Sequence, residues 1–154
     1  MNFKFIINIF GRVLILLGLF MLTSIIWAFV YHEKTVIPLL LSAVTTLVSG
    51  VAMYYSTTKN LKKELGLKDS YFTVTFTWVI ITLYGTLPYL FTGAIPWFVD
   101  AIFETVSGFT TTGSSILRDI EALPKSVLFW RSLTHWIGGM GIIVLVVASL
   151  TGWR

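Results

Sequence analysis

Hydroxyl and acidic side chains gather in one short stretch of the chain, residues 96–115. Its last part, residues 110–115, reads Thr-Thr-Thr-Gly-Ser-Ser, and two acids, Asp100 and Glu104, lie four residues apart just before it. Hydroxyl and backbone carbonyl oxygens can replace the water molecules around a cation. Gly113 reaches left-handed backbone angles without a Cβ clash, so successive carbonyls can aim the same way. The stretch is therefore a candidate path for a cation.

A short helix is predicted directly before these hydroxyls, over residues 96–109. Pro96 suits the start of a helix and Gly108 suits its end. A helix over residues 97–107 would be about 16 Å long, which is about half of the roughly 30 Å hydrocarbon layer of a bilayer. Such a helix dips into the membrane with its C-terminus pointing toward the centre. The partial negative charge at that C-terminus would favour a cation.

The two acids share one face of that predicted helix. Asp100 either complements the helix dipole or faces an outer vestibule. Glu104 lies deeper, and an acid at membrane depth normally has a partner or lines a pathway. Two roles stay open for Glu104 at this point, bracing the loop and attracting cations.

The composition places these residues in a membrane. Hydrophobic residues make up 56% of the chain and charged residues only 12%, against roughly 25% in soluble domains, and the mean hydropathy is +0.86. The intervals 13–31, 35–58 and 70–99 hold no charged residue or histidine, and 132–153 holds only His135. Each is near or above the roughly 20 residues that span a bilayer. The chain has no cysteine, which excludes disulfides and cysteine metal sites.

The predicted fold class is an all-α membrane protein, in which an N-terminal transmembrane hairpin is followed by one helix–pore loop–helix repeat. The helical part of residues 96–115 is too short to cross the bilayer and the rest is too polar, and non-helical backbone at that depth must be buried in protein or reached by water. They are therefore expected to dip in and return. The expected divisions are a hairpin over 1–58, a cytoplasmic loop over 59–70, and a repeat over 71–150 made of an outer helix (71–93), a pore helix (96–109), a filter (110–115) and an inner helix (125–150).

The distribution of basic residues predicts the orientation. Residues 59–68 contain four lysines, whereas the connection 32–34 contains one. The positive-inside rule then puts the N-terminus and the 59–70 loop in the cytoplasm of a multi-pass inner-membrane protein. The basic residues flank the helices, so the net charge of +4 is not a sign of nucleic-acid binding. Arg131, with Lys125 and Arg118, would fall outside, and we assign these residues to the loop.

Glycines punctuate the last predicted helix. The segment Trp136-Ile-Gly-Gly-Met-Gly141 places three glycines in four positions. In a membrane such residues let backbones approach closely or let a helix bend. Both roles are open on sequence grounds.

Two long motifs resemble a known family. Residues 100–115, DAIFETVSGFTTTGSS, and residues 129–145, FWRSLTHWIGGMGIIVL, are similar to the membrane subunit, of the TrkH type, of the Trk/Ktr potassium-uptake family. The resemblance extends over essentially the whole chain and covers the N-terminal hairpin and the first pore repeat of that family. It implies that the ion is potassium and is the substrate, and that the protein needs no cofactor.

The resemblance also implies roles for individual residues. Residues 111–115 take the place of the TVGYG segment of potassium channels, with Ser115 where that segment has its second glycine, and this predicts limited selectivity. Potassium would be bound through Thr111, Thr112 and Gly113. The full predicted set is ion binding by Thr110, Thr111, Thr112, Gly113 and Ser114, with support from Glu104, Gly108 and Ser115.

The sequence departs from the family in length, since family members carry four pore repeats and this chain has one. The gating loop and basic residue of the later repeats are missing. We therefore expect a fragment or truncated form, or a chain that assembles in copies, that does not conduct potassium as a monomer. The expected partners are membrane lipid, further pore repeats or copies and, by resemblance, a cytosolic nucleotide-binding regulatory subunit.

Two other functions compete with potassium uptake. The chain could be an accessory or assembly membrane protein without its own ion path. It could also be an intramembrane hydrolase that uses Ser114 or Ser115 with His135, but no acid is placed to orient the histidine and no G-x-S-x-G motif is present. Residues 108–115 do not form a phosphate-binding loop, because the lysine that such a loop requires is missing. We therefore do not expect an enzyme.

Overall fold

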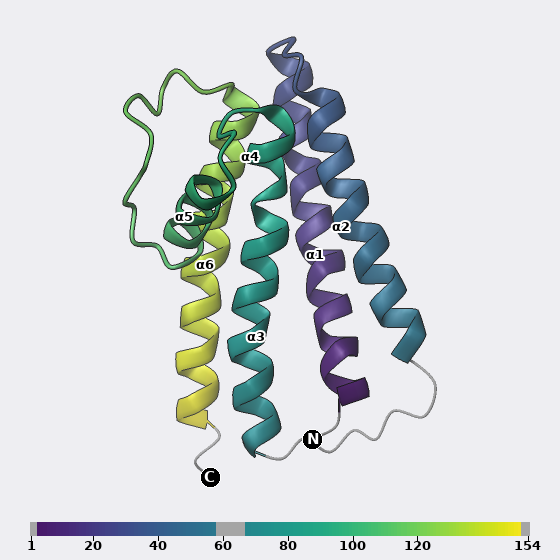
Figure 1. Cartoon of the computed structure of the whole chain (residues 1–154). Helices are drawn as coiled ribbons and strands as arrows, with labels where there is room; N and C mark the ends of the chain where they lie inside the picture. Colours follow the sequence, from purple (N-terminus) through teal and green to yellow (C-terminus); the bar gives the residue numbers. More distant parts are fainter. Residues whose placement is uncertain (1–2, 58–66, 152–154) are drawn as a thin grey trace.

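The computed structural model describes residues 3–57 and 67–151, and it describes no side chain of residues 67–68 or 142–151. Within these ranges the regular structure is all helical, without a strand (Figure 1). The helices are α1 (Phe3–Val30), α2 (Val36–Thr57), α3 (Leu67–Gly85), α4 (Leu87–Thr92), α5 (Phe98–Phe109) and α6 (Lys125–Thr151).

Three helical stretches are long and apolar enough to cross a membrane. They are Phe3–Val30, Val36–Thr57 and Asp69–Thr92, the last of which combines α3 and α4. The 27 residues of α6 give it a length of about 40 Å, enough to cross as well. The prediction of an all-α membrane fold is confirmed.

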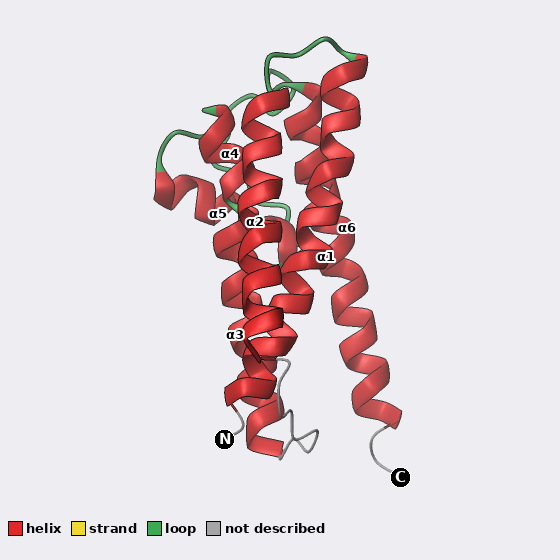
Figure 2. Cartoon of the chain, turned by 90° about the vertical axis from the view of Figure 1, so that its right-hand side faces the viewer, coloured by secondary structure: helices red, strands yellow, loops and turns green. Residues whose placement is uncertain are grey.

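The chain re-enters the bundle between α4 and α6. The long helices lie side by side, and α5 is a short helix that crosses them part of the way down (Figure 1). The loop after α5 returns to the end of the bundle where α6 starts, which is also the end of the turn between α1 and α2 (Figure 2). The buried core joins α1, α3, α5 and α6 through Leu14, Leu17, Met21, Ile81, Phe109 and Trp130.

Several boundaries differ from those expected. Residues 67–70 belong to α3, so the expected 59–70 loop is shorter at its C-terminal side, and the rest of that loop lies outside the described residues. The short helix begins at Phe98, with Trp97 as its N-cap, rather than at Pro96. Trp97 has an extended backbone, as N-cap residues typically do.

The expected outer helix, 71–93, is interrupted at Thr86. Pro88 has no backbone N–H, so the helical pattern of hydrogen bonds cannot continue through it. The backbone N–H of Tyr89 donates to the carbonyl of Thr86 at 3.1 Å instead of that of Gly85. The indole Nε1 of Trp130, in α6, donates to the released Gly85 carbonyl at 3.0 Å. The break therefore ties the outer helix to the inner one.

The hairpin of α1 and α2 is held by glycines. A Cβ on Gly11 would lie 2.7 Å from the backbone nitrogen of Tyr54, and a Cβ on Gly50 would lie 2.8 Å from that of Ile15. Only glycine leaves room for such an approach, as in other membrane helix pairs. Asn8 adds a buried hydrogen bond from Nδ2 to the hydroxyl of Thr57 at 3.2 Å.

Candidate functional site

The short helix α5 ends in a left-handed turn formed by a threonine. The amide of Thr112 donates to the carbonyl of Ser107 at 3.0 Å, and that of Thr111 donates to the carbonyl of Gly108 at 2.9 Å. This is the Schellman arrangement, in which the left-handed residue is usually glycine. Here it is Thr111, with φ of 56°. A β-branched residue in this region is strained, and such strain concentrates at functional sites.

Helix α5 ends where the predicted 96–109 helix ends, and Gly108 lies in its last turn. Helix α5 continues through Gly108 to Phe109. The glycine is needed for space, because a Cβ there would lie 2.3 Å from Oγ1 of Thr134 in α6. Gly138 in α6 is its counterpart, since a Cβ there would lie 2.0 Å from the carbonyl oxygen of Phe109. Close approach is thus the role of Gly138 in the glycine-rich segment.

The five residues predicted to bind the ion, Thr110 to Ser114, are all exposed on this chain. Gly113 also has a left-handed backbone, with φ of 78°. Within the described part of the chain, no hydrogen bond uses the carbonyl oxygens of Thr111, Thr112 or Gly113. Their neighbours differ, because Thr110 accepts a bond from the Thr111 hydroxyl and Ser114 accepts one from Ser107.

The threonine hydroxyls fasten the start of this stretch. Oγ1 of Thr110 donates to the carbonyl of Val106 at 2.8 Å. The same oxygen lies 2.8 Å from Oγ1 of Thr112. These contacts hold the hydroxyls of Thr110 and Thr112 against the end of α5.

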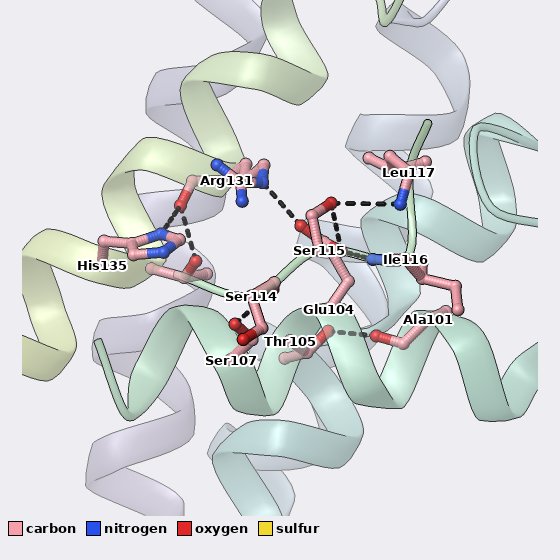
Figure 3. Close-up of polar contacts among 11 residues, drawn as sticks. Ala101, Glu104, Thr105, Ser107, Ser114, Ser115, Ile116, Leu117, Arg131 and His135 are labelled. Atoms are coloured by element: carbon pink, nitrogen blue, oxygen red, sulfur yellow. Dashed lines mark hydrogen bonds and ion pairs between the residues drawn. The ribbon is translucent and has the colours of Figure 1, made fainter. Parts of the chain in front are cut away.

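Glu104 fixes the C-terminal end of this stretch through hydrogen bonds to Ser115 and Ile116. Its side chain is fully buried, and Oε2 accepts bonds from the Ser115 hydroxyl at 2.9 Å and the Ile116 amide at 3.1 Å. Oε1 accepts a bond from Nε of Arg131 in α6 at 2.6 Å (Figure 3). Of the two roles left open for Glu104, the geometry favours bracing the loop, because its oxygens are occupied and water does not reach them.

The role of Arg131 was missed by the sequence reasoning, which assigned the residue to the outer loop without a partner. Its side chain is 15% exposed and forms an ion pair with the fully buried Glu104. A buried carboxylate needs a partner. The predicted depth of Glu104 was therefore the sequence signal that could have pointed to a basic partner such as Arg131. Ser107 and Trp130 were missed as well, because nothing in their spacing marks the atoms that they contact.

Two further polar side chains near the site differ in their surroundings. Asp100 lies half-buried in the first turn of α5, where a carboxylate complements the helix dipole. The hydroxyl of Tyr89 is buried and forms no hydrogen bond with the residues that the structure describes. Neither side chain contacts the exposed carbonyls through a described hydrogen bond.

The serine and histidine of the hydrolase alternative do not meet. Nδ1 of His135 donates to the carbonyl of Arg131 at 2.9 Å, and the Ser115 hydroxyl donates to Glu104 (Figure 3). Ser114 takes part through its backbone carbonyl, which accepts the Ser107 hydroxyl. The described contacts therefore form no nucleophile and base pair.

The fold and site together define a class, an α-helical membrane protein in which a short helix and a returning loop lie between two long helices. The profile of the TrkH family, described as "Cation transport protein", matches residues 38–152. The chain belongs to this family, which is one of transporters rather than enzymes. The resemblance noted from the two sequence motifs is confirmed.

Relatives of known name agree with this assignment. The chain is 33% identical over 151 residues to the Trk system potassium uptake protein TrkH of Halomonas elongata, covering 97% of this chain and 31% of that protein. It is 36% identical, with the same coverage, to that of Vibrio parahaemolyticus. The crystal structure of the potassium transporter TrkH from Vibrio parahaemolyticus superposes with a TM-score of 0.90 at 35% identity, covering 97% of this chain and 32% of that chain. The chain thus spans about a third of the length of these relatives.

Proposed function

We propose that this chain supplies one pore repeat of a potassium-uptake transporter. The observation that carries the proposal is the row of three successive carbonyls on the exposed residues Thr111, Thr112 and Gly113, which accept no hydrogen bond from the residues that the structure describes. Carbonyl oxygens held in such a row replace the hydration shell of potassium in selective pores. Thr110 and Ser114 flank the row.

The supporting contacts keep this row in place. Ser107 binds the Ser114 carbonyl, and Glu104 binds Ser115 and Ile116. Both come from α5, which is itself fixed on α6 at Gly108 and Gly138. A binding geometry supported from rigid elements needs little rearrangement when the ion arrives. Ser115 in place of a second glycine makes the filter less regular, so potassium is preferred over sodium only moderately.

One repeat provides one side of a pore. The exposed filter adjoins apolar side chains of α5 that are also exposed, Phe103 at 48% and Val106 at 40%. Such a surface beside an ion path fits contact with further pore repeats or with copies of the chain. In this arrangement the N-terminus faces the cytoplasm of an inner membrane, and a cytosolic nucleotide-binding subunit regulates the assembly.

A chimera tests the proposal. In it, this chain replaces the matched third of the Vibrio parahaemolyticus potassium transporter TrkH, and uptake of potassium and sodium is measured in cells that depend on the chimera for potassium. We expect potassium uptake from the unmodified chimera and a loss of roughly tenfold or more on Gly113→Ala, because alanine is strained at positive φ. Gly93→Ala is the matched control, since Gly93 also has a positive φ, 71°, with open space around it, away from the filter.

The accessory alternative makes a different prediction for the same experiment. If the chain carries no ion path, Gly113→Ala and Gly93→Ala lower uptake equally, through folding alone, and the ratio of potassium to sodium uptake stays constant. That result would overturn the proposed function. The chain expressed without further repeats is expected to show no uptake unless copies assemble.

A further inference from the structure

The turn between α1 and α2 contacts the start of α6 through one carboxylate. Oε1 of Glu33 accepts the backbone N–H of Lys125, and Oε2 accepts the N–H of Ser126 at 3.1 Å and the Ser126 hydroxyl. The Thr35 hydroxyl also donates to Oε2, at 3.2 Å, and it lies 2.8 Å from the Ser126 hydroxyl. We call these four residues the Glu33 latch.

The latch joins parts of the molecule that are far apart in sequence. Glu33 belongs to the N-terminal hairpin, and Lys125 begins the inner helix 92 residues later. The first N–H groups of a helix have no partner within it, and a carboxylate there satisfies them and complements the helix dipole. Charge-assisted bonds of this kind are stronger than neutral ones.

Further along α6 lie three contacts with parts of the chain around the filter loop, the segment 110–124 between α5 and α6. Trp130 binds the Gly85 carbonyl, Arg131 binds Glu104, and Gly138 contacts the Phe109 backbone. All three follow Ser126 along one continuous helix. A shift of α6 at its start would therefore reach the residues that hold Ser115 and Ile116.

We propose that Glu33 is a positioning residue for the filter, which the N-terminal hairpin uses to fix the start of α6 and, through α6, the loop that follows α5. The proposal rests on the proposed function for its transport consequence only. Its structural content, that the hairpin sets the position of the filter loop, is independent of which ion passes.

The hydrogen bonds of the Glu33 latch should weaken when the solution on that side of the membrane is acidified and Glu33 is protonated. Partial burial raises the pKa of Glu33, but the hydrogen bonds from Ser126, Lys125 and Thr35 outweigh it and hold the pKa below the usual carboxyl value. A group with a lowered pKa stabilises the fold above its unfolded pKa, about 4.3 for glutamate, and the contribution is lost as the pH falls through the folded value. His32, Lys34 and Lys125 are the neighbouring titratable side chains, and none forms a described ion pair with Glu33.

Hydrogen exchange on the chain tests the structural claim without transport. In Glu33→Ala, the amides of Lys125 and Ser126 should exchange roughly tenfold faster or more, as the loss of charge-assisted bonds predicts. The amides of Ile116 and Leu117, in the filter loop, should exchange several-fold faster as well. Glu121→Gln, which neutralises an exposed carboxylate four residues before Lys125, should change neither.

A disulfide provides the rescue. The chain has no cysteine, and the hydroxyls of Thr35 and Ser126 lie 2.8 Å apart, so Thr35→Cys and Ser126→Cys bring two thiols together for oxidation. Added to Glu33→Ala under oxidising conditions, this bond should return the exchange of Ile116 and Leu117 to that of the unmodified chain, and reduction should abolish the effect. If the filter-loop amides are unaffected by Glu33→Ala, Glu33 is only a helix cap and the proposal is overturned.

Uptake by the chimera then gives the transport consequence. Glu33→Ala should lower potassium uptake several-fold, and the fall in uptake on external acidification should vanish in the disulfide-linked variant. A linked variant that keeps the acid-induced fall contradicts the positioning role. If the unmodified chimera takes up no potassium, the proposed function fails, and the exchange experiment alone decides the role of Glu33.

Discussion

Glycines bring two pairs of helices into close contact in this chain, α1 with α2 and α5 with α6. The polar groups beside the two contacts differ. At Gly11 and Gly50, α1 and α2 meet backbone to backbone, and nearby hydroxyls such as Thr46 donate to carbonyls of their own helix. At Gly108 and Gly138, α5 and α6 meet as closely, but beside them lies an ion pair between Glu104 and Arg131. A buried charge pair is costly in a membrane. Among the described residues such a pair lies beside the second contact and not the first, and there it helps to position a loop.

Removing the carboxylate of Glu104 should have the largest effect. Glu104→Ala leaves Arg131 mostly buried without its partner, which costs about 3–5 kcal/mol. It also removes the acceptor of Ser115 and Ile116. Unfolding of the chain in detergent should show the loss of stability, and the chimera should lose potassium uptake.

The double variant separates the two consequences. Glu104→Met with Arg131→Met replaces a buried pair by apolar side chains, which is often neutral for stability. We expect stability to recover while uptake stays low, because the Ser115 hydroxyl and Ile116 amide still lack their acceptor. Normal uptake by the double variant would show that the pair has no part in placing the loop.

Adjacent glycines in α6 test the close contact with α5. A Cβ at position 138 meets the Phe109 carbonyl oxygen at 2.0 Å, whereas a Cβ at position 139 meets only Cγ2 of Thr111 at 3.6 Å. Gly138→Ala should therefore destabilise by about 1–3 kcal/mol or more and alter the ratio of potassium to sodium uptake. Gly139→Ala should preserve both, and equal effects of the two substitutions would argue against the contact.

The matching substitution in the hairpin sharpens the contrast. In Gly50→Ala the new Cβ would lie 2.8 Å from the backbone nitrogen of Ile15, and overpacking of this kind costs about 1–3 kcal/mol. Thermal unfolding should report a loss like that of Gly138→Ala. The uptake ratio of potassium to sodium should be unchanged, and a change would mean that the hairpin shapes the filter directly.

The smallest expected effect is on the strained threonine. Thr111→Gly relieves a left-handed residue, worth about 1–2 kcal/mol, against about 0.4–1 kcal/mol lost because glycine frees the unfolded chain. Stability should therefore rise by about 1.6 kcal/mol or less, while uptake loses selectivity for potassium. Unchanged selectivity would remove the argument that the strain serves the filter.

Much of the fold follows from local pattern. Charge-free runs of spanning length predict the long helices, and the polar 110–115 stretch between two of them predicts a segment that turns back. The division of the outer helix could be anticipated only in part. Pro88 cannot lie in the interior of a regular helix without removing a hydrogen bond. The partner of the Gly85 carbonyl at the interruption, however, is the indole N–H of Trp130, 45 residues away.

The candidate site divides in the same way. Residue types and backbone freedom point to the carbonyls around Gly113, because these properties belong to the residues themselves. Other parts of the site depend on which helices become neighbours. These are the ion pair of Glu104 with Arg131, the close approach of Gly108 to Thr134 and the hydrogen bonds of Ser126 to Glu33. The spacing of residues in the sequence does not predict contacts between distant segments. Only the packing of α6 against α5 and the hairpin determines them.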